Sequence, residues 1–242
     1  MQYINTTHLS VAAFSPTDIA GLNMWLDSSQ ESFSDNDAVG TATDFSGNNN
    51  DATQGTAGAK PTFKTNIING QPVFRFDGGD FMSAAIGYAN AAFTIFVVGS
   101  WTSAIFPSII AEYNSTTSGY LACGLRDLGG GSAAISTHKT GVNTSTSNLT
   151  VTTTVPALIA YKSAGISGGT ADVLCYKNGT AASGTVQQTT LSTNTAINIG
   201  ASKGGTADIL TGDIAQILIY DSQLSDTNRG LVETYLMDLY GL

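Results

Sequence analysis

The sequence predicts an all-β protein, a two-sheet antiparallel sandwich that carries one short helix at its C-terminal end. Short apolar strand signals recur at even spacing along the 242 residues, which is typical of a sandwich or a barrel. Two Asn-Gly pairs, at 69–70 and 178–179, lie between such signals and favour tight hairpins, because both residue types tolerate a positive φ. Strand and helix patterns do not alternate, so we expect no parallel α/β sheet.

The strand signals are short runs rich in β-branched and aromatic residues, which suit a pleated surface. Residues 93–99, FTIFVVG, are apolar on both faces, so we expect a central strand that is buried on both sides. The polar run 140–154, rich in Thr, Ser and Asn, is expected to form an exposed loop that leads into a strand. The other strand signals are 67–68, 73–76, 120–126, 157–161, 173–177, 197–200 and 214–220.

The helix signal lies at the end of the chain. Ser225 is a good N-cap, Asp226 places a negative charge in the first turn, and Gly241 follows the last turn. The apolar residues between them keep helical spacing, which predicts one stripe that packs against the sandwich. The members of this stripe are Leu231, Val232, Tyr235, Leu236 and Leu239.

The composition argues against two kinds of partner. Charged residues make up 11% of the chain, against about 25% in typical soluble domains, and 42% of the residues are hydrophobic, so we expect a substantial core. The net charge of -9, with 9 Lys and Arg spread singly, argues against nucleic acid. Residues 81–111 carry no charge, but Gly, Pro, Asn, Ser and Thr interrupt them, so we predict buried sheet and no membrane insertion.

Two cysteines, Cys123 and Cys175, each lie inside a strand signal. Such a pair makes neither a zinc site nor a disulfide framework. We expect small buried side chains, and a single bridge between neighbouring strands stays open.

The sequence offers little for catalysis. Glycoside hydrolases use two carboxylates that flank the scissile bond, and on one strand these would stand two residues apart to share a face. None of the glutamates has a carboxylate at that spacing, whereas Asp35 and Asp37 have it but lie in a loop-like Ser/Asn/Asp stretch. The chain has 2 histidines, which argues against a histidine general base and against a catalytic zinc site. We therefore expect a protein that is not an enzyme.

Residues 44–51, DFSGNNND, allow two interpretations. Oxygen ligands at alternate positions around a glycine suit Ca²⁺, and Asp44, Asn48 and Asp51 are the candidate ligands. The spacing is not that of an EF-hand, and the same residue types build tight turns through side-chain to backbone hydrogen bonds. We favour the structural turn and expect no required cofactor, with Ca²⁺ as the alternative.

Four segments, 19–27, 44–51, 72–78 and 212–221, occur in this order before the predicted helix. As a set they resemble the concanavalin A-like lectin/glucanase superfamily, in its bacterial and phage laminin G-like branch. The resemblance implies a jelly-roll sandwich of two curved antiparallel sheets, and such domains commonly bind glycans or proteins, often with Ca²⁺. We expect this domain to cover residues 16–242, after an N-terminal arm of residues 1–15.

A lectin-like surface would hold sugars between aromatic faces and hydrogen-bonding side chains. Residues of both kinds gather in or beside the middle strand signals, although a single aromatic residue there is more often packed in the core. The candidate ligand-binding residues are Trp101, Tyr113, Asn114, Tyr120, Arg126 and His138.

The N-terminal sequence bears on where the protein acts. Laminin G-like modules usually act outside the cell, yet residues 1–15 lack the basic and long apolar regions of a signal peptide. Release by lysis would reconcile the two, so we expect a phage virion component at the virion surface, namely a capsid decoration, fibre or tail protein with a lectin-like domain. A secreted or cell-surface carbohydrate-binding adhesion module is the alternative. A glycoside hydrolase on the same fold, dependent on Asp35 or Asp37, ranks last.

Two kinds of partner follow from this expectation. The arm, with Tyr3, Ile4, Leu9, Val11 and Phe14, would attach to other virion proteins, for instance by adding a strand to a sheet edge. Cell-surface glycans are the second kind. Assembly with further copies of the same chain stays open.

Overall fold

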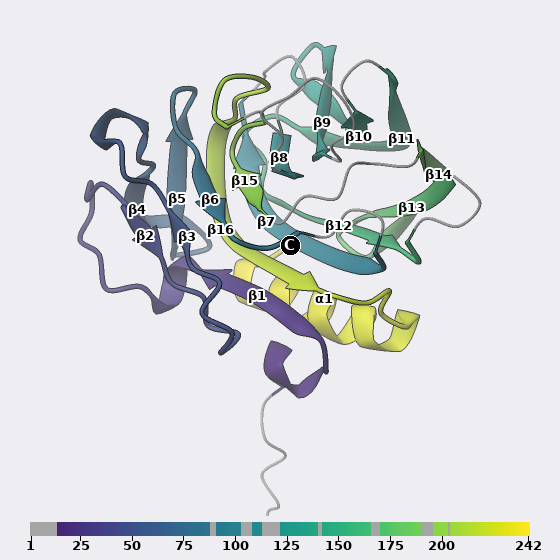
Figure 1. Ribbon diagram of the computed structural model, residues 1–242, viewed down its shortest axis with the longest axis horizontal. Coiled ribbons are helices and arrows are strands. Elements are labelled where there is room, and N and C mark those ends of the chain that lie inside the picture. Colours follow the sequence, from purple (N-terminus) through teal and green to yellow (C-terminus); the bar gives the residue numbers. More distant parts are fainter. Residues whose placement is uncertain are drawn as a thin grey trace, which may run out of the picture.

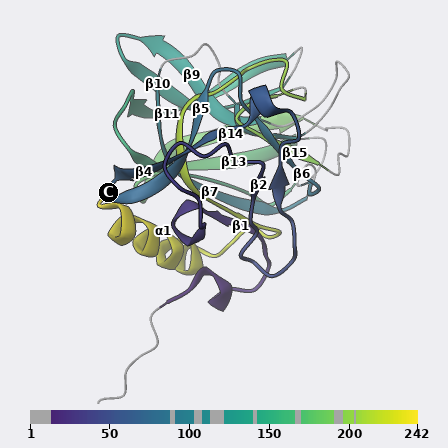
Figure 2. The same ribbon diagram turned by 90° about the vertical axis from the view of Figure 1, so that its left-hand side faces the viewer.

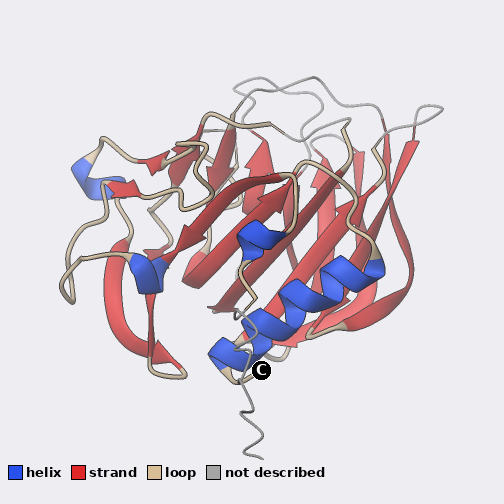
Figure 3. Cartoon of the chain, turned by 90° about the horizontal axis from the view of Figure 1, so that it is seen from below, coloured by secondary structure: helices blue, strands red, loops and turns tan. Residues whose placement is uncertain are grey.

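The structure, a computed structural model, describes residues 14–87, 91–102, 108–112, 122–139, 142–165, 170–189, 196–202 and 204–242. Within these residues the chain forms two antiparallel sheets of 8 strands each (Figure 1). One helix, α1 (Asp226–Tyr240), lies across the outer face of the first sheet (Figure 3). The predicted two-sheet antiparallel sandwich with a C-terminal helix is confirmed.

The first sheet has the strand order β14-β13-β12-β7-β16-β5-β4, and β1 pairs with the C-terminal part of β16. The N-terminal part of β16 pairs with β5, so β16 is the strand that joins the two halves of this sheet. Its strands are β1 (Leu22–Asp27), β4 (Thr62–Ile68), β5 (Gln71–Asp77), β7 (Phe93–Trp101), β12 (Ala157–Ser163), β13 (Thr170–Lys177), β14 (Thr180–Thr189) and β16 (Thr211–Tyr220).

The second sheet has the order β11-β10-β9-β8-β15-β6-β3-β2. Three short 3-10 helices, η1 (Pro16–Asp18), η2 (Ser28–Gln30) and η3 (Ala57–Ala59), lie in the connections of the N-terminal third. The strands of the second sheet are β2 (Thr41–Ala42), β3 (Ala52–Thr53), β6 (Met82–Ala84), β8 (Ser108–Glu112), β9 (Ala122–Gly129), β10 (Ser132–Lys139), β11 (Val142–Thr152) and β15 (Ile197–Ile199).

The first sheet is apolar on both faces because it contributes to two separate cores. Ile95 and Val97 of β7 lie in the core between the sheets, whereas Phe96 and Val98 lie in the core between the first sheet and α1. Residues of β16 alternate in the same way. Figure 2 shows the resulting layers, with α1 on one side of β7 and strands β9 and β10 on the other. The predicted central strand at 93–99 is therefore confirmed.

The helix begins and ends where its capping residues predict. The Ser225 hydroxyl accepts a hydrogen bond from the Asn228 backbone N–H, and Gly241 closes the helix in the left-handed region with φ of 66°. The buried face is narrower than the predicted stripe, because Leu231 is 47% exposed. Val232, Leu236 and Tyr240, spaced four residues apart, form the buried centre instead.

Local turn signals and the polar run had different outcomes. Both Asn-Gly pairs form hairpin turns with positive φ, one between β4 and β5 and one between β13 and β14. The run 140–154 was expected to be a loop, but residues Val142–Thr152 form the edge strand β11. An edge strand can be this polar because only part of it faces the core, here through buried Val151 and partly buried Leu149.

The two cysteines are buried, as expected, but they lie in different sheets. Cys123 is in β9 of the second sheet and Cys175 is in β13 of the first. The alternative of a bridge between neighbouring strands is therefore wrong. Burial raises the pKa of the Cys175 thiol to about 12, which keeps it protonated at neutral pH.

The uncharged stretch contains strands β6 and β7, in agreement with the predicted buried sheet. In the described part of the chain, no helix has both the length and the apolar character needed to cross a membrane. Of the predicted arm, residues 1–13 lie outside the described residues. Phe14 packs edge-on against Tyr235 of α1, with ring centroids 6.0 Å apart.

Candidate functional site

The outer face of the first sheet changes from apolar to polar beyond the area that α1 covers. Val73 of β5 and Val98 of β7 lie under the helix. Two residues further along each strand, on the same face, stand Arg75 of β5 and Ser100 of β7. A polar surface therefore continues the helix-covered core across the same strands.

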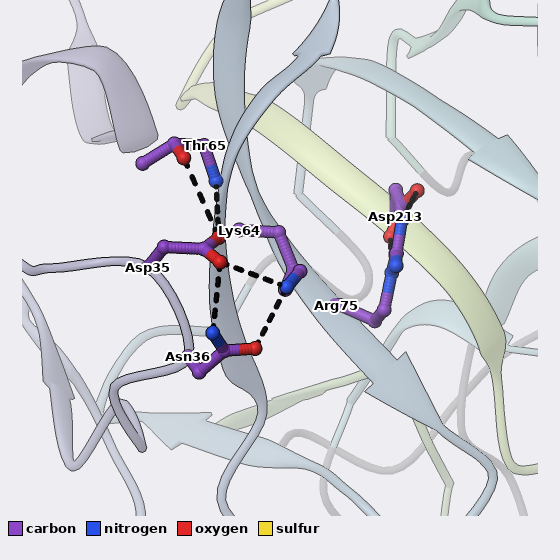
Figure 4. A network of polar contacts seen from close by, with 6 residues as sticks. All are labelled: Asp35, Asn36, Lys64, Thr65, Arg75 and Asp213. Atoms are coloured by element: carbon purple, nitrogen blue, oxygen red, sulfur yellow. Dashed lines mark hydrogen bonds and ion pairs between the residues drawn. The ribbon is translucent and has the colours of Figure 1, made fainter.

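Asp213 of β16 lies at the centre of this polar surface. The register places it directly opposite Arg75 on one side and Ser100 on the other. Arg75 Nε donates to Asp213 Oδ1 at 2.7 Å and Arg75 Nη2 donates to Oδ2 at 2.9 Å, a bidentate ion pair (Figure 4). Hydrogen bonding to Asp213 raises the pKa of Arg75 above its usual value. The Asp213 side chain is 10% exposed and that of Arg75 is 43% exposed, so the guanidinium is the half of the pair that solvent reaches.

A groove of about 570 Å³ opens over this row. It extends across the sheet from the end of β4 to the turn before β12, and hydroxyl and apolar side chains line it beside the ion pair. The lining residues are Ile67, Ile68, Arg75, Phe76, Asp77, Ser100, Thr102, Thr154, Pro156, Thr211, Gly212 and Asp213.

Two glycines let β7 and β16 approach each other under the groove. A Cβ added to Gly99 would clash with the Asp213 carbonyl oxygen, and one added to Gly212 would clash with the Ser100 carbonyl oxygen. Both Cβ–oxygen distances would be under 3.0 Å, which real Cβ atoms essentially never show. The close contact holds the backbones of Asp213 and Ser100 side by side. Glycine is therefore required here for backbone approach.

A second ion pair extends the polar surface onto β4. Lys64 Nζ lies 3.1 Å from Asp35 Oδ2 and donates to Asn36 Oδ1 at 2.7 Å (Figure 4). Asp35 Oδ1 accepts a hydrogen bond from the Thr65 backbone N–H at 3.0 Å, and this bond together with Lys64 lowers the pKa of the Asp35 carboxyl. Asp37, two residues on, accepts from the Ser34 backbone N–H within its own turn. Both carboxylates of the loop-like stretch thus hold local structure.

The ligand-binding residues predicted from the sequence do not come together in one site among the described residues. Trp101 is 2% exposed and belongs to the core between the sheets, so its expected role as a surface ring for a sugar has to be corrected. Strand alternation turns it inward, opposite to its neighbour Ser100. Arg126 lies in β9 and His138 in β10, both in the second sheet, away from the groove. Tyr113, Asn114 and Tyr120 lie outside the described residues.

The loop at 44–51 is internally hydrogen-bonded. Asp44 Oδ1 accepts from the backbone N–H groups of Trp25 and Ser46, and Oδ2 accepts from the Ser46 hydroxyl and the Asn50 N–H. Asp51 Oδ1 accepts from the Asp44 N–H, and the Asn48 amide donates to the Leu22 carbonyl. A structural turn accounts for these bonds. Among the described side chains no group of three or more His, Cys, Asp or Glu could hold a metal ion, and Ca²⁺ at this loop stays a prediction.

Sequence reasoning missed the ion pair at the centre of the groove. Arg75 and Asp213 are 138 positions apart, so no local motif contains both. One signal was present: each is a charged residue with apolar neighbours in a strand, VFRF in β5 and GDIA in β16. A buried strand carries a charge only where that charge is paired or reaches solvent.

Comparisons with protein-family models and with curated proteins find no match, whereas many solved structures share the fold. Domain 4 of AbnA, a GH43 extracellular arabinanase from Geobacillus stearothermophilus in complex with arabinotriose, is 12% identical with a TM-score of 0.61, over 90% of this chain and 98% of that domain. A GH54 α-L-arabinofuranosidase is 15% identical with a TM-score of 0.63, over 84% of this chain and 51% of that one. The receptor binding domain of botulinum neurotoxin D is 12% identical with a TM-score of 0.60, over 92% of this chain and 54% of that one.

This chain spans about half the length of the arabinofuranosidase and of the toxin domain. At these identities the likeness shows the fold alone.

The expectation that the protein is not an enzyme is contradicted by these comparisons, since the similar structures include glycoside hydrolases. That expectation rested on the missing pair of carboxylates two residues apart. The criterion was too narrow, because side chains from different strands can meet in a folded sheet at any sequence separation, as the guanidinium of Arg75 and the carboxylate of Asp213 do. Fold alone assigns no catalytic residue to this chain.

Proposed function

We propose that this protein recognises carbohydrate, and that the groove over Arg75 and Asp213 is the binding site. The observation that carries the proposal is a solvent-open groove with a fixed ion pair in its floor and hydroxyl side chains around it. The complex of AbnA domain 4 with arabinotriose adds support, because that domain shares the fold over nearly its whole length.

The chemistry of the groove suits a polyol. Sugar hydroxyls need hydrogen-bond donors and acceptors in fixed positions, and sugar C–H groups need small apolar surfaces. Asp213 holds the Arg75 guanidinium in one orientation, so that donor loses little conformational entropy when it binds a ligand. Ser100 and Thr211 flank the pair, and Ile67 and Pro156 supply apolar surface at the two sides.

The test is titration of the protein with arabinotriose, followed by NMR or calorimetry, with variants of the floor. We expect Arg75→Ala to weaken binding at least tenfold, because a charge-assisted hydrogen bond contributes about 1.5–3 kcal/mol. Ser100→Ala removes one neutral hydroxyl, for which we expect a loss of roughly fivefold. Lys177→Ala changes a cation that bonds the Thr150 carbonyl away from the groove and serves as control.

The variant Ser100→Ala also guards against misfolding, since Arg75→Ala leaves Asp213 without its partner. If arabinotriose and a broad panel of neutral and acidic oligosaccharides cause no change at β5, β7 or β16, the groove is not a carbohydrate site. Equal affinities for the wild type and for a folded Arg75→Ala variant would contradict the proposal as well.

The phage virion role expected from the sequence is a separate proposal. In it the protein is a component of the virion surface and contacts other virion proteins through residues 1–15. Its support is the sequence alone, namely the low charge of the chain, its resemblance to the laminin G-like branch and the apolar residues of the arm. Electron microscopy of particles that carry a chain without residues 1–14 tests it. We expect loss of attachment with a folded domain, and intact attachment would refute it.

A further inference from the structure

The charges that line the groove do not balance. Among its lining residues the cation Arg75 stands against two carboxylates, Asp213 and Asp77. Asp213 pairs with Arg75 through both oxygens, whereas none of the ion pairs between described residues involves Asp77. The exposed Asp77 side chain accepts a hydrogen bond from the Gly79 N–H and interacts with the neighbouring Asp80 carboxyl, but it has no cationic partner among the lining residues. The groove therefore carries an excess of one negative charge.

The cation Lys64 of β4 does not offset this excess. Lys64 is bound to Asp35 and to the Asn36 side-chain oxygen, so its charge is already compensated. Asp80, beside Asp77, adds a further carboxyl behind the groove, and its Oδ2 accepts from the Asp77 backbone N–H. The chain as a whole is acidic, with a net charge of -9. Among the lining residues of the groove, a negatively charged ligand therefore meets no uncompensated cation.

We propose that the groove selects uncharged sugars over acidic ones, and that Asp77 is the residue that sets this selection. The inference rests on the proposed carbohydrate-binding function. A carboxylate on a sugar ring would be repelled by Asp77 across a few ångströms, and the repulsion weakens with salt. Hydroxyl groups of a neutral sugar can instead donate to the carboxylate oxygens of Asp77, which have lone pairs beyond the one that Gly79 uses.

The experiment compares sugars that differ in charge. Galactotriose and trigalacturonate have the same three rings and differ at C6, where the first has CH₂OH groups and the second has carboxylates. For the wild type we expect galactotriose to bind roughly tenfold tighter than trigalacturonate at low salt, and this ratio to shrink in about 0.3 M NaCl. Asp77→Asn is expected to reduce the ratio to about twofold, and Asp77→Lys to reverse it.

Asp172→Lys is the matched control, because it makes the same change in net charge at an exposed position of β13 outside the groove. It should leave the ratio unchanged. An acidic member that binds wild type as tightly as its neutral partner overturns the inference and leaves the proposed function standing. So does an unchanged ratio in Asp77→Asn, a conservative variant that keeps the size of the side chain. Absence of binding by every sugar overturns the proposed function and the inference with it.

Discussion

At the scale of single residues, Asp80 is a buried carboxylate beside the groove. It is 5% exposed, and its Oδ2 accepts a hydrogen bond from the Asp77 backbone N–H at 2.9 Å. Burial raises the pKa of its carboxyl to about 6, since the hydrogen bond does not compensate for the loss of water around the charged form. This side chain is therefore partly protonated in mildly acidic solution.

The raised pKa predicts a pH dependence of stability. Below the pKa of Asp80 in the unfolded state, near 4, the carboxyl is protonated in both the native and the unfolded state. Above that pH the native state binds the proton more tightly than the unfolded state does. The resulting contribution to the free energy of unfolding is lost as pH rises through about 6. Asp80→Asn removes the titration. We expect the free energy of unfolding of the variant, relative to wild type, to rise from near zero at pH 4 to about 1–3 kcal/mol at pH 8.

Urea denaturation at several pH values measures this difference. Asp172→Asn, at an exposed position, is the control and should show no such trend. A difference between Asp80→Asn and wild type that stays constant with pH would contradict the buried, titrating carboxyl.

At the scale of elements, α1 is held on the first sheet by an apolar face and by a group of charges at its N-terminal half. Lys162 of β12, 6% exposed, donates to Asp226 Oδ1 at 2.7 Å and to the Leu224 carbonyl at 3.2 Å. Arg229 pairs with Glu233 and lies 4.0 Å from the ring centroid of Tyr176. The charges are paired where they are buried, so no buried charge in this group lacks a partner of opposite sign.

The apolar contacts of α1 predict a clear contrast between two leucines of the same helix. Leu236 is fully buried against the sheet, whereas Leu231 is 47% exposed. Leu236→Ala is expected to lower the free energy of unfolding by about 2–5 kcal/mol because it leaves a cavity. Leu231→Ala, the matched control, should change it by at most about 0.5 kcal/mol. Chemical denaturation measures both, and similar losses would contradict the buried face described here.

At the scale of the whole molecule, three layers share the central strands of the first sheet. β7 and β16 send alternate side chains into the core between the sheets and into the core under α1. A change on one face of these strands is therefore felt on the other, since protein interiors are close-packed. The groove lies where this shared sheet extends beyond the helix, on strands that both cores hold in place.

The shared strands predict that the two cores unfold together. Trp101 lies in the core between the sheets and Trp25 in the core under α1, so single-tryptophan variants report on each core separately. Trp101→Phe leaves Trp25 as the fluorescent reporter, and Trp25→Phe leaves Trp101. In each variant we expect the fluorescence transition in urea to coincide with the far-UV circular dichroism transition. In Trp101→Phe, a Trp25 fluorescence midpoint at a lower urea concentration than the circular dichroism midpoint would mean that the helix layer unfolds first. That result would contradict the coupling.

Local patterns predicted part of the fold well. The Asn-Gly hairpins, the buried strand β7 and the caps of α1 are set by interactions between residues close in sequence, and they were confirmed. β11 was missed because its polar composition reflects its place at the edge of the second sheet, which only the pairing of strands reveals. The aromatic residue chosen as a sugar platform, Trp101, was misjudged because its face depends on which side of β7 is covered.

The sequence by itself determined the class of fold and the position of its closing helix, because strand alternation, turn residues and helix caps act over a few residues. Only the tertiary structure decided where the candidate site lies. Arg75, Asp213 and Ser100 come from three strands distant in sequence, and only the antiparallel register sets them in one row. Their pairing also fixes the charge of the groove, since Asp77 has an excess charge only because Arg75 is already bound to Asp213.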